Sequence, residues 1–186
     1  MLARMRKNRA LRQTARLLYG SIVTAARQRR FYASWGAPDT LQGRFELILL
    51  HLVLAQHRLA CEGRCGARLA RALNEAFIAD IDDQMREMTF GDLAVPREIG
   101  SAAAALFDRW RAFSAALAAG QERTLGEALA AQLAYLDPEA RIDTASLAGY
   151  MRRTAEALVA QPSARVLAGD FAWPALPENS PQEPPP

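Results

Sequence analysis

Several residue types are scarce in this sequence, and each scarcity narrows the class of protein. Val, Ile and Thr are sparse while Ala is abundant, and no segment alternates apolar and polar residues as a strand does. Because this composition favours helix, we expect an all-α fold. Lysine occurs once, as Lys7, against 22 arginines, a bias that we attribute to genomic composition before chemistry. The two cysteines, Cys61 and Cys65, would be reduced thiols in a cytoplasmic protein.

Membrane-crossing segments and catalytic motifs are missing too. The most apolar run, Leu47 to Ala55, contains His51 and is far too short to cross a bilayer, so it predicts a buried core helix. The N-terminus lacks the apolar segment of a secretory signal, although its Arg-rich, acid-free composition also resembles an organelle transit peptide. The sequence has no Gly-rich phosphate loop, no Gly-x-Ser-x-Gly, no His-Glu-x-x-His and no Cys-x-x-Cys. These absences favour a non-enzymatic protein without a cofactor.

Charge is distributed unevenly along the chain. Nine basic residues and no acid precede Asp39, whereas the remainder holds 14 basic and 20 acidic residues, a net charge of −6. A basic arm therefore precedes a mildly acidic body, and this asymmetry suggests an anionic partner for the arm, either RNA or a membrane surface. A solvated terminal helix is the alternative. The residues that we expect to bind an anionic surface are Arg4, Arg6, Lys7, Arg9, Arg12 and Arg16.

Apolar stripes with three- and four-residue spacing predict one helical domain. We expect a basic amphipathic helix at residues 1–31, a helical domain at 32–175 and a disordered, Pro-rich tail at 176–186. Gly63 and Gly66 are expected to stop the second helix. The expected helices lie near residues 8–30, 40–60, 67–90, 97–118, 124–136 and 144–160.

Two capping patterns mark the starts of helices. Asp39 is expected to cap the second helix, with Gln42 three residues later completing a capping box. Thr124 and Glu127 form the same pattern at the expected start of the fifth helix.

Two clusters carry metal-ligating side chains but lack a complete ligand set. Asp80, Asp83 and Glu87 share a helix face, yet a di-metal bundle site needs Glu-x-x-His pairs, and neither histidine has a Glu three residues before it. The alternative is an exposed acidic face with Arg86 paired to Asp82 or Asp83. We therefore expect no metal at this face.

Histidine and cysteine raise the same question in the second helix and the loop after it. His57, Cys61 and Cys65 have the spacing of a zinc site on a helix, but a fourth ligand is not apparent and glycines interrupt the segment. Two ordinary loop thiols are the alternative, which we favour. His51 is expected to be a core histidine hydrogen-bonded to a neighbour.

The order of three motif groups distinguishes this chain from a generic helical protein. The first is Gly36-x-Pro38-Asp39-Thr40-x-x-Gly43-Arg44-Phe45-Glu46 with His51 after it. The second is Phe77-x-x-Asp80-x-Asp82-Asp83-x-x-Arg86-Glu87 with Gly91-Asp92-Leu93-x-Val95-Pro96, and Leu167-Ala168-Gly169 and Trp173-Pro174 close the set. Together they resemble the ubiquinol-cytochrome c chaperone family, the assembly factors of the cytochrome bc1 complex.

The resemblance implies an all-helical, non-enzymatic chaperone whose client is newly made cytochrome b. Mitochondrial members act near the ribosome exit and work with a small partner protein. A bacterial member would serve cytochrome b in the cytoplasm, at the periphery of the inner membrane, and a eukaryotic host would place it in mitochondria. The alternative function is a ribosome- or nucleic-acid-binding module acting through the basic arm. A helical-bundle metalloenzyme is the third class.

The resemblance also marks candidate interface residues. Gly43 permits close approach of another backbone, and charged side chains beside an apolar helix suit an interface better than a core. Met85 and Met88 are expected in the core, and would offer adaptable surface if exposed. The residues that we expect to contact a client or partner are Pro38, Asp39, Arg44, Glu46, Asp80, Asp83, Arg86, Glu87 and Asp92.

Overall fold

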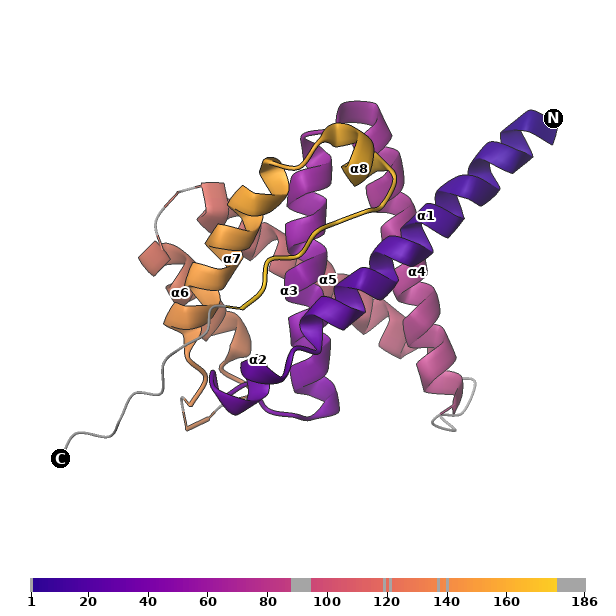
Figure 1. Ribbon diagram of the computed structural model, residues 1–186. Helices are drawn as coiled ribbons and strands as arrows, with labels where there is room; N and C mark the ends of the chain where they lie inside the picture. The colour runs from indigo at the N-terminus through magenta and orange to yellow at the C-terminus, as the bar shows by residue number, and fades with distance from the viewer. Residues whose placement is uncertain are drawn as a thin grey trace.

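The computed structural model describes residues 2–87, 95–118, 120, 122–136, 138–139 and 141–176. In this part of the chain the regular structure is helical and no strand occurs, so the expected all-α class is confirmed (Figure 1). None of these helices has both the length and the hydropathy needed to cross a bilayer. The helices are α1 (Leu2–Ala26), α2 (Arg29–Ala33), α3 (Leu41–Ala60), α4 (Gly63–Glu87), α5 (Val95–Ala118), α6 (Glu122–Leu133), α7 (Thr144–Val159) and α8 (Ser163–Leu167).

Helix α3 is the centre of the molecule. It packs against α1, α4, α5 and α7, and Leu49, Leu52 and Leu54 along it are fully buried. In Figure 1 it stands in the middle, with α1 crossing it diagonally. The run that the sequence marks as most apolar is thus a core helix enclosed on several sides, as expected.

The second half of helix α1 packs in this core, whereas its first half lies largely outside the core. The stripe Ala15, Leu18 and Ile22 is buried in the same hydrophobic core as α3. Residues 5–10 are exposed, and Figure 1 shows the N-terminal turns of α1 projecting beyond the other helices. The basic arm therefore shares its core with the helical domain expected from residue 32 onward.

Several expected helix boundaries are wrong, and two of them have a local cause that the sequence pattern does not show. The helix expected over 8–30 is two helices, since the backbone N–H groups of Arg27 and Gln28 bond back to Thr24 and Ala25 and end α1 at Ala26. Helix α4 begins at Gly63, which has a left-handed φ of 54°, so the expected start at residue 67 is late by one turn. The tail expected at 176–186 lies outside the described residues after Leu176.

The two expected capping boxes are also wrong. Thr40 caps α3, because its hydroxyl oxygen accepts a hydrogen bond of 3.1 Å from the Gly43 N–H. The Asp39 carboxylate instead accepts from Arg44 Nε at 2.7 Å, which draws it away from the helix end. Helix α6 begins at Glu122, so Thr124 lies in its first turn and not at its N-cap.

His51 is the expected core histidine. Its side chain is fully buried, with Nδ1 2.7 Å from the Leu47 carbonyl oxygen and Nε2 2.8 Å from the Tyr150 hydroxyl. Because a carbonyl oxygen only accepts, Nδ1 carries the proton and Nε2 accepts from Tyr150. Burial lowers the pKa of His51 to about 4, partly offset by its bond to the Leu47 carbonyl. The ring is therefore neutral at physiological pH.

The chain after α8 fastens α1 to the body. It returns across α3 in Figure 1, where Phe171 is buried and Trp173 Nε1 donates to Ser21 Oγ of α1 at 3.1 Å. The Gln161 side chain donates to the Ala172 carbonyl and accepts from the Ala172 N–H, which fixes this segment. The closing aromatic motif thus holds α1 in place.

Candidate functional site

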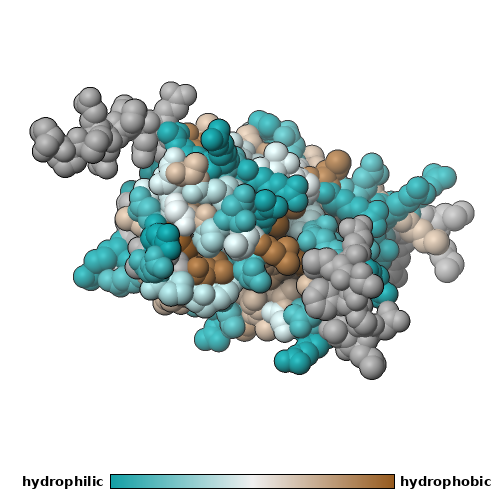
Figure 2. Space-filling model, turned by 90° about the horizontal axis from the view of Figure 1, so that it is seen from below, coloured by the Kyte–Doolittle hydropathy of each residue, from teal (hydrophilic) through white to brown (hydrophobic). Residues whose placement is uncertain are grey.

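A groove of about 490 Å³ opens between α1, α3, α4 and α5. On the face seen from below, Figure 2 shows apolar side chains gathered in a hollow that hydrophilic side chains border. The apolar lining is Val23, Leu41, Phe45, Ile48, Ile81, Met85, Ala102 and Ala105, and the polar lining is Tyr19, Arg27, Gln42, Arg44, Glu46, Asp80, Gln84, Glu98, Ser101, Arg109 and Tyr135.

The apolar lining continues the core stripe of α4 into the open. Along this stripe Phe77 is fully buried, Ile81 is 8% exposed and Met85 is half-buried, so burial decreases toward the C-terminal end of the helix. Phe45 of α3 packs on Phe77, with ring centroids 6.1 Å apart. Met85 packs against the core as expected, yet it also lines the groove. Met88 lies outside the described residues.

A buried ion pair forms the floor of the groove. Arg109 of α5 donates from Nε to Glu46 Oε2 at 2.9 Å and from Nη2 to Glu46 Oε1 at 2.5 Å, and the Tyr135 hydroxyl donates to Oε1 at 2.8 Å. Glu46 is 4% exposed, so it lies inside the protein and not on the open surface that its motif suggested. Burial alone would lower the pKa of Arg109, but the hydrogen bonds and charge of Glu46 outweigh it and raise the pKa.

Asp80 forms part of one wall. Its carboxylate accepts from the Tyr19 hydroxyl of α1 at 2.7 Å and from Gln84 Nε2 at 2.6 Å. Burial raises the pKa of Tyr19, and the hydrogen bond to Asp80 raises it further. Asp80 therefore joins α4 to α1 while it faces the groove.

Asp82 and Asp83 of α4 do not line the groove. Asp83 is exposed, and Arg86 Nε contacts Asp82 Oδ2 at 2.9 Å on an exposed face, which confirms the expected pairing. The Glu87 side chain and all of Asp92 lie outside the described part of the chain, as does the Arg4 side chain. Of the expected face-sharing acids whose side chains are described, Asp80 lines the groove and Asp83 does not.

The rim between α1, α2 and α3 is basic. A second, open recess of about 610 Å³ adjoins the groove there and is lined by Arg27, Arg29, Tyr32, Ala33, Asp39 and Arg44. The hydrogen bond from Arg44 holds the pKa of Asp39 below its ordinary value. Arg27 and Arg44 line both the recess and the groove.

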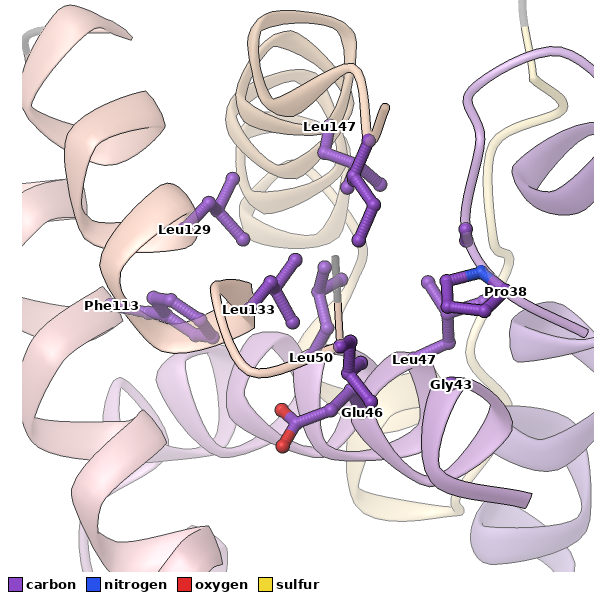
Figure 3. Close-up of a pocket in the computed structure, with 12 residues that line it drawn as sticks. Pro38, Gly43, Glu46, Leu47, Leu50, Phe113, Leu129, Leu133 and Leu147 are labelled. Atoms are coloured by element: carbon purple, nitrogen blue, oxygen red, sulfur yellow. The ribbon is translucent and has the colours of Figure 1, made fainter. Parts of the chain in front are cut away.

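A third pocket lies inside the protein behind Pro38. It measures about 10 Å³, room for little more than a water molecule, and is no ligand site. Figure 3 shows leucines that line it pointing toward one another and the Glu46 carboxylate turned away from Pro38. This pocket belongs to the packing that supports the first turn of α3.

A substitution of Gly43, in the first turn of α3, tests how tightly the Pro38 segment packs against this helix. A Cβ added at Gly43 would lie 2.0 Å from the Pro38 carbonyl oxygen, so the close approach expected at this glycine is observed. Helix propensity favours alanine by about 1 kcal/mol, yet we expect Gly43→Ala to lower the free energy of unfolding by about 1–3 kcal/mol through overpacking. Urea denaturation of the purified protein measures this.

The matched control for Gly43 is Gly100 of α5, where an added Cβ meets no atom within 4 Å. Gly100→Ala is expected to stabilise the protein by up to about 1 kcal/mol through propensity alone. Equal effects of the two substitutions would contradict the packing described for Pro38.

His57, Cys61 and Cys65 are not arranged as a zinc site in the structure. Cys61 is the C-cap of α3 and Cys65 lies in the first turn of α4, and both thiols are exposed. In the described part of the chain, no group of three or more His, Cys, Asp or Glu residues is placed to hold a metal ion. The expected loop position is wrong for Cys65, which is helical.

Comparison with known proteins identifies the family. Residues 33–173 match the model of the family described as ubiquinol-cytochrome C chaperone. The chain belongs to this family. The crystal structure of the Cbp3 homolog from Brucella abortus matches with a TM-score of 0.81 and 32% sequence identity, covering 95% of this chain and 98% of that chain. No curated protein matches the sequence.

The family match agrees with the resemblance that the motifs suggested. The chain is a member of a family of chaperones for ubiquinol-cytochrome c reductase, with the all-helical fold of the Cbp3 homolog. The matched residues include the motifs from Gly36 onward and end at Trp173 of the closing Trp173-Pro174 pair. Arg109 and Tyr135, which complete the floor of the groove, carry no local signal, since their contact with Glu46 spans 63 and 89 residues.

Proposed function

We propose that this member of the family is a non-enzymatic assembly chaperone of the bc1 complex that holds an apolar segment of newly made cytochrome b in the groove between α1, α3, α4 and α5. The observation that carries the proposal is the groove itself. It exposes a continuation of the core stripe beside polar and charged side chains, and a concave surface that combines apolar lining with positioned polar groups is typical of a binding site.

The physical need for such a groove follows from the client. An apolar segment of a membrane protein that is not yet inserted exposes surface that water disfavours. Helix-in-groove contacts bury such surface through apolar side chains at three- and four-residue spacing. Met85 on the wall adapts to different side chains because its thioether chain is unbranched and flexible.

The polar groups of the groove serve structure and recognition. The Glu46 carboxylate is engaged by Arg109 and Tyr135, and the Asp80 carboxylate by Tyr19 and Gln84. A general acid or base needs a proton-accepting position facing a substrate, whereas these carboxylates hold helices together. We therefore assign no catalytic role to these two carboxylates.

A charge placed in the apolar wall tests the proposal. Ala105→Glu puts a carboxylate into the groove, and we expect it to lower the amount of assembled bc1 complex severalfold, because a client segment would have to desolvate the charge. Ala103→Glu, on the exposed face of the same helix, is the control and should leave assembly unchanged. Haem-stained membrane profiles measure bc1, and circular dichroism of both purified variants measures folding.

Normal bc1 levels with a folded, expressed Ala105→Glu protein would remove the groove from the proposal. In a separate experiment, a photo-crosslinker at position 105 identifies what the groove contacts, and one at position 103 is the control. Cytochrome b should be captured from position 105 only, and a small partner subunit at either position would be found in the same experiment. Asp80 is a poor choice for charge reversal, because the change would also break the bond to Tyr19.

The basic arm supports a second contact, to an anionic surface. Arg6, Lys7, Arg9, Arg12 and Arg16 are all exposed on α1, and so is the apolar side chain of Met5. Such a helix end binds anionic lipid or the phosphates of a ribosome through charge, which would place the chaperone in the cytoplasm at the inner membrane, or in mitochondria in a eukaryotic host.

A charge reversal on the arm tests whether its cations bind an anionic surface. Arg6→Glu with Arg9→Glu and Arg12→Glu is expected to reduce salt-sensitive co-sedimentation with anionic liposomes or with ribosomes. The control carries the same change of charge at Arg64, Arg68 and Arg71, which are exposed on α4. Unchanged co-sedimentation with both partners would refute the role of the arm.

A further inference from the structure

The basic recess beside the groove is chemically distinct from the groove. Three guanidinium groups, those of Arg27, Arg29 and Arg44, line it together with the single carboxylate of Asp39, so its charged lining is net cationic. Tyr32 adds a phenol, whose hydroxyl donates to the Ala26 carbonyl oxygen at 3.2 Å. Arginine binds carboxylates through two parallel hydrogen bonds, which suits this recess to an anionic side chain.

The recess and the groove form one continuous surface. Arg27 and Arg44 line both. Burial raises the pKa of Tyr19 in the groove and of Tyr32 in the recess, and the charge of Arg27 opposes both shifts. Arg27 therefore lies within electrostatic reach of both phenols, at the junction of the two spaces.

Other charged side chains of the groove have the opposite sign. Asp80 of α4 and Glu98 of α5 line the groove, while the Glu46 charge on the floor is matched by Arg109. The site is thus basic where α1, α2 and α3 meet and acidic along α4 and α5. A purely apolar ligand would use neither set of charges.

We propose that the segment held in the groove is an apolar peptide with carboxylates next to its apolar run, and that Arg27, Arg29 and Arg44 bind those carboxylates. This inference rests on the proposed function and specifies its substrate class. A site with charges of both signs fits a peptide with charges of both signs better than it fits an anionic lipid, because Asp80 and Glu98 repel a phosphate but pair with a cationic residue elsewhere on a peptide. Like-charge contacts also exclude wrong ligands.

Synthetic peptides with one leucine- and alanine-rich core test the inference. One carries a pair of glutamates at its N-terminal end, one carries the pair at its C-terminal end, and a third has glutamines in their place. Fluorescence anisotropy with the full-length chain measures each Kd. One glutamate peptide is expected to bind about tenfold more tightly than the glutamine peptide, and the advantage should shrink at high salt.

Charge exchange on the protein gives the decisive comparison. Arg27→Glu with Arg29→Glu should remove the advantage of the glutamate peptide and should favour a matching lysine peptide instead. Arg64→Glu with Arg68→Glu on α4 is the control with the same change of net charge and should change neither Kd. Arg44 is kept, because it also pairs with Asp39 at the start of α3.

Each outcome separates this inference from the proposed function. Equal binding of glutamate and glutamine peptides that Ala105→Glu abolishes would overturn the inference and keep the groove as client site. No binding of any peptide to the unmodified chain would overturn both. If the Arg27 and Arg29 double variant loses binding to anionic liposomes but not to the glutamate peptide, the recess is a lipid-headgroup site and the inference is wrong.

Discussion

Replacing Glu46 with alanine is expected to lower the free energy of unfolding by about 3–5 kcal/mol, the usual cost of breaking a buried ion pair. The substitution leaves the Arg109 guanidinium buried without its carboxylate, and the side chains of Glu46 and Arg109 are only 3% and 12% exposed. The Tyr135 hydroxyl loses its acceptor as well, but Tyr135 is 57% exposed and its hydroxyl can turn to water. The main cost therefore falls on Arg109.

Thermal and urea denaturation measure this effect. For a chain of this size a loss of that order lowers Tm by roughly 10 °C. Arg71→Ala is the control, since it breaks the Arg71–Glu75 pair, whose side chains are 85% and 54% exposed, and Tm should not change. A Glu46→Ala protein that melts like the unmodified chain would show that the buried pair contributes nothing.

A double replacement separates the charge from the packing. Glu46→Leu with Arg109→Leu removes both charges, and buried ion pairs replaced by apolar side chains often keep or gain stability. We expect the double variant to be more stable than Glu46→Ala. A double variant that is less stable would indicate that the hydrogen bonds of this cluster hold α3, α5 and α6 in register.

The second large effect is a loss of stability in mild acid through His51. Its pKa is about 4 in the folded protein against an ordinary value of 6.5, so the unfolded state binds the proton more readily. The stability that the neutral ring contributes is complete above pH 6.5 and is lost as the pH falls from 6.5 toward 4. Over this window the loss amounts to about 3 kcal/mol.

Urea midpoints measured across this pH window check the prediction. His51→Gln keeps a donor for Leu47 and an acceptor for Tyr150 but cannot titrate, so its stability should depend less on pH. The half-buried His57, whose pKa burial also lowers, contributes in the same direction, and His57→Asn removes that share. Identical pH profiles for His51→Gln and the unmodified chain would contradict the role of His51.

Local patterns in the sequence were sufficient for the elements and for much of the core. The stripe through Leu69, Leu73 and Phe77 predicts a buried helix face because the period of a helix brings such residues together, and all three are buried in α4. His51 within an apolar helix is buried for the same reason. The ordered motifs also predicted the family, which the match over residues 33–173 confirms.

Choices between neighbouring residues needed the tertiary structure. Asp39 and Thr40 are both good N-caps in sequence, and Thr40 caps α3 because Arg44 engages the Asp39 carboxylate. Such a choice depends on the position of a third side chain, which a sequence pattern does not specify.

The groove and its floor were decided only by tertiary packing. The motif around Glu46 suggests a surface charge. In the folded protein Glu46 instead accepts hydrogen bonds from Arg109 and Tyr135, which are far away in the sequence and come close because α5 and α6 pack near α3. The site opens where α1 meets α4 through the Tyr19–Asp80 bond, and Arg27 lies at its rim because α1 ends at Ala26. The sequence by itself determined which faces of the helices are apolar, since helical periodicity is local. How those faces meet, and which part of them stays open, depends on contacts between residues far apart in the chain.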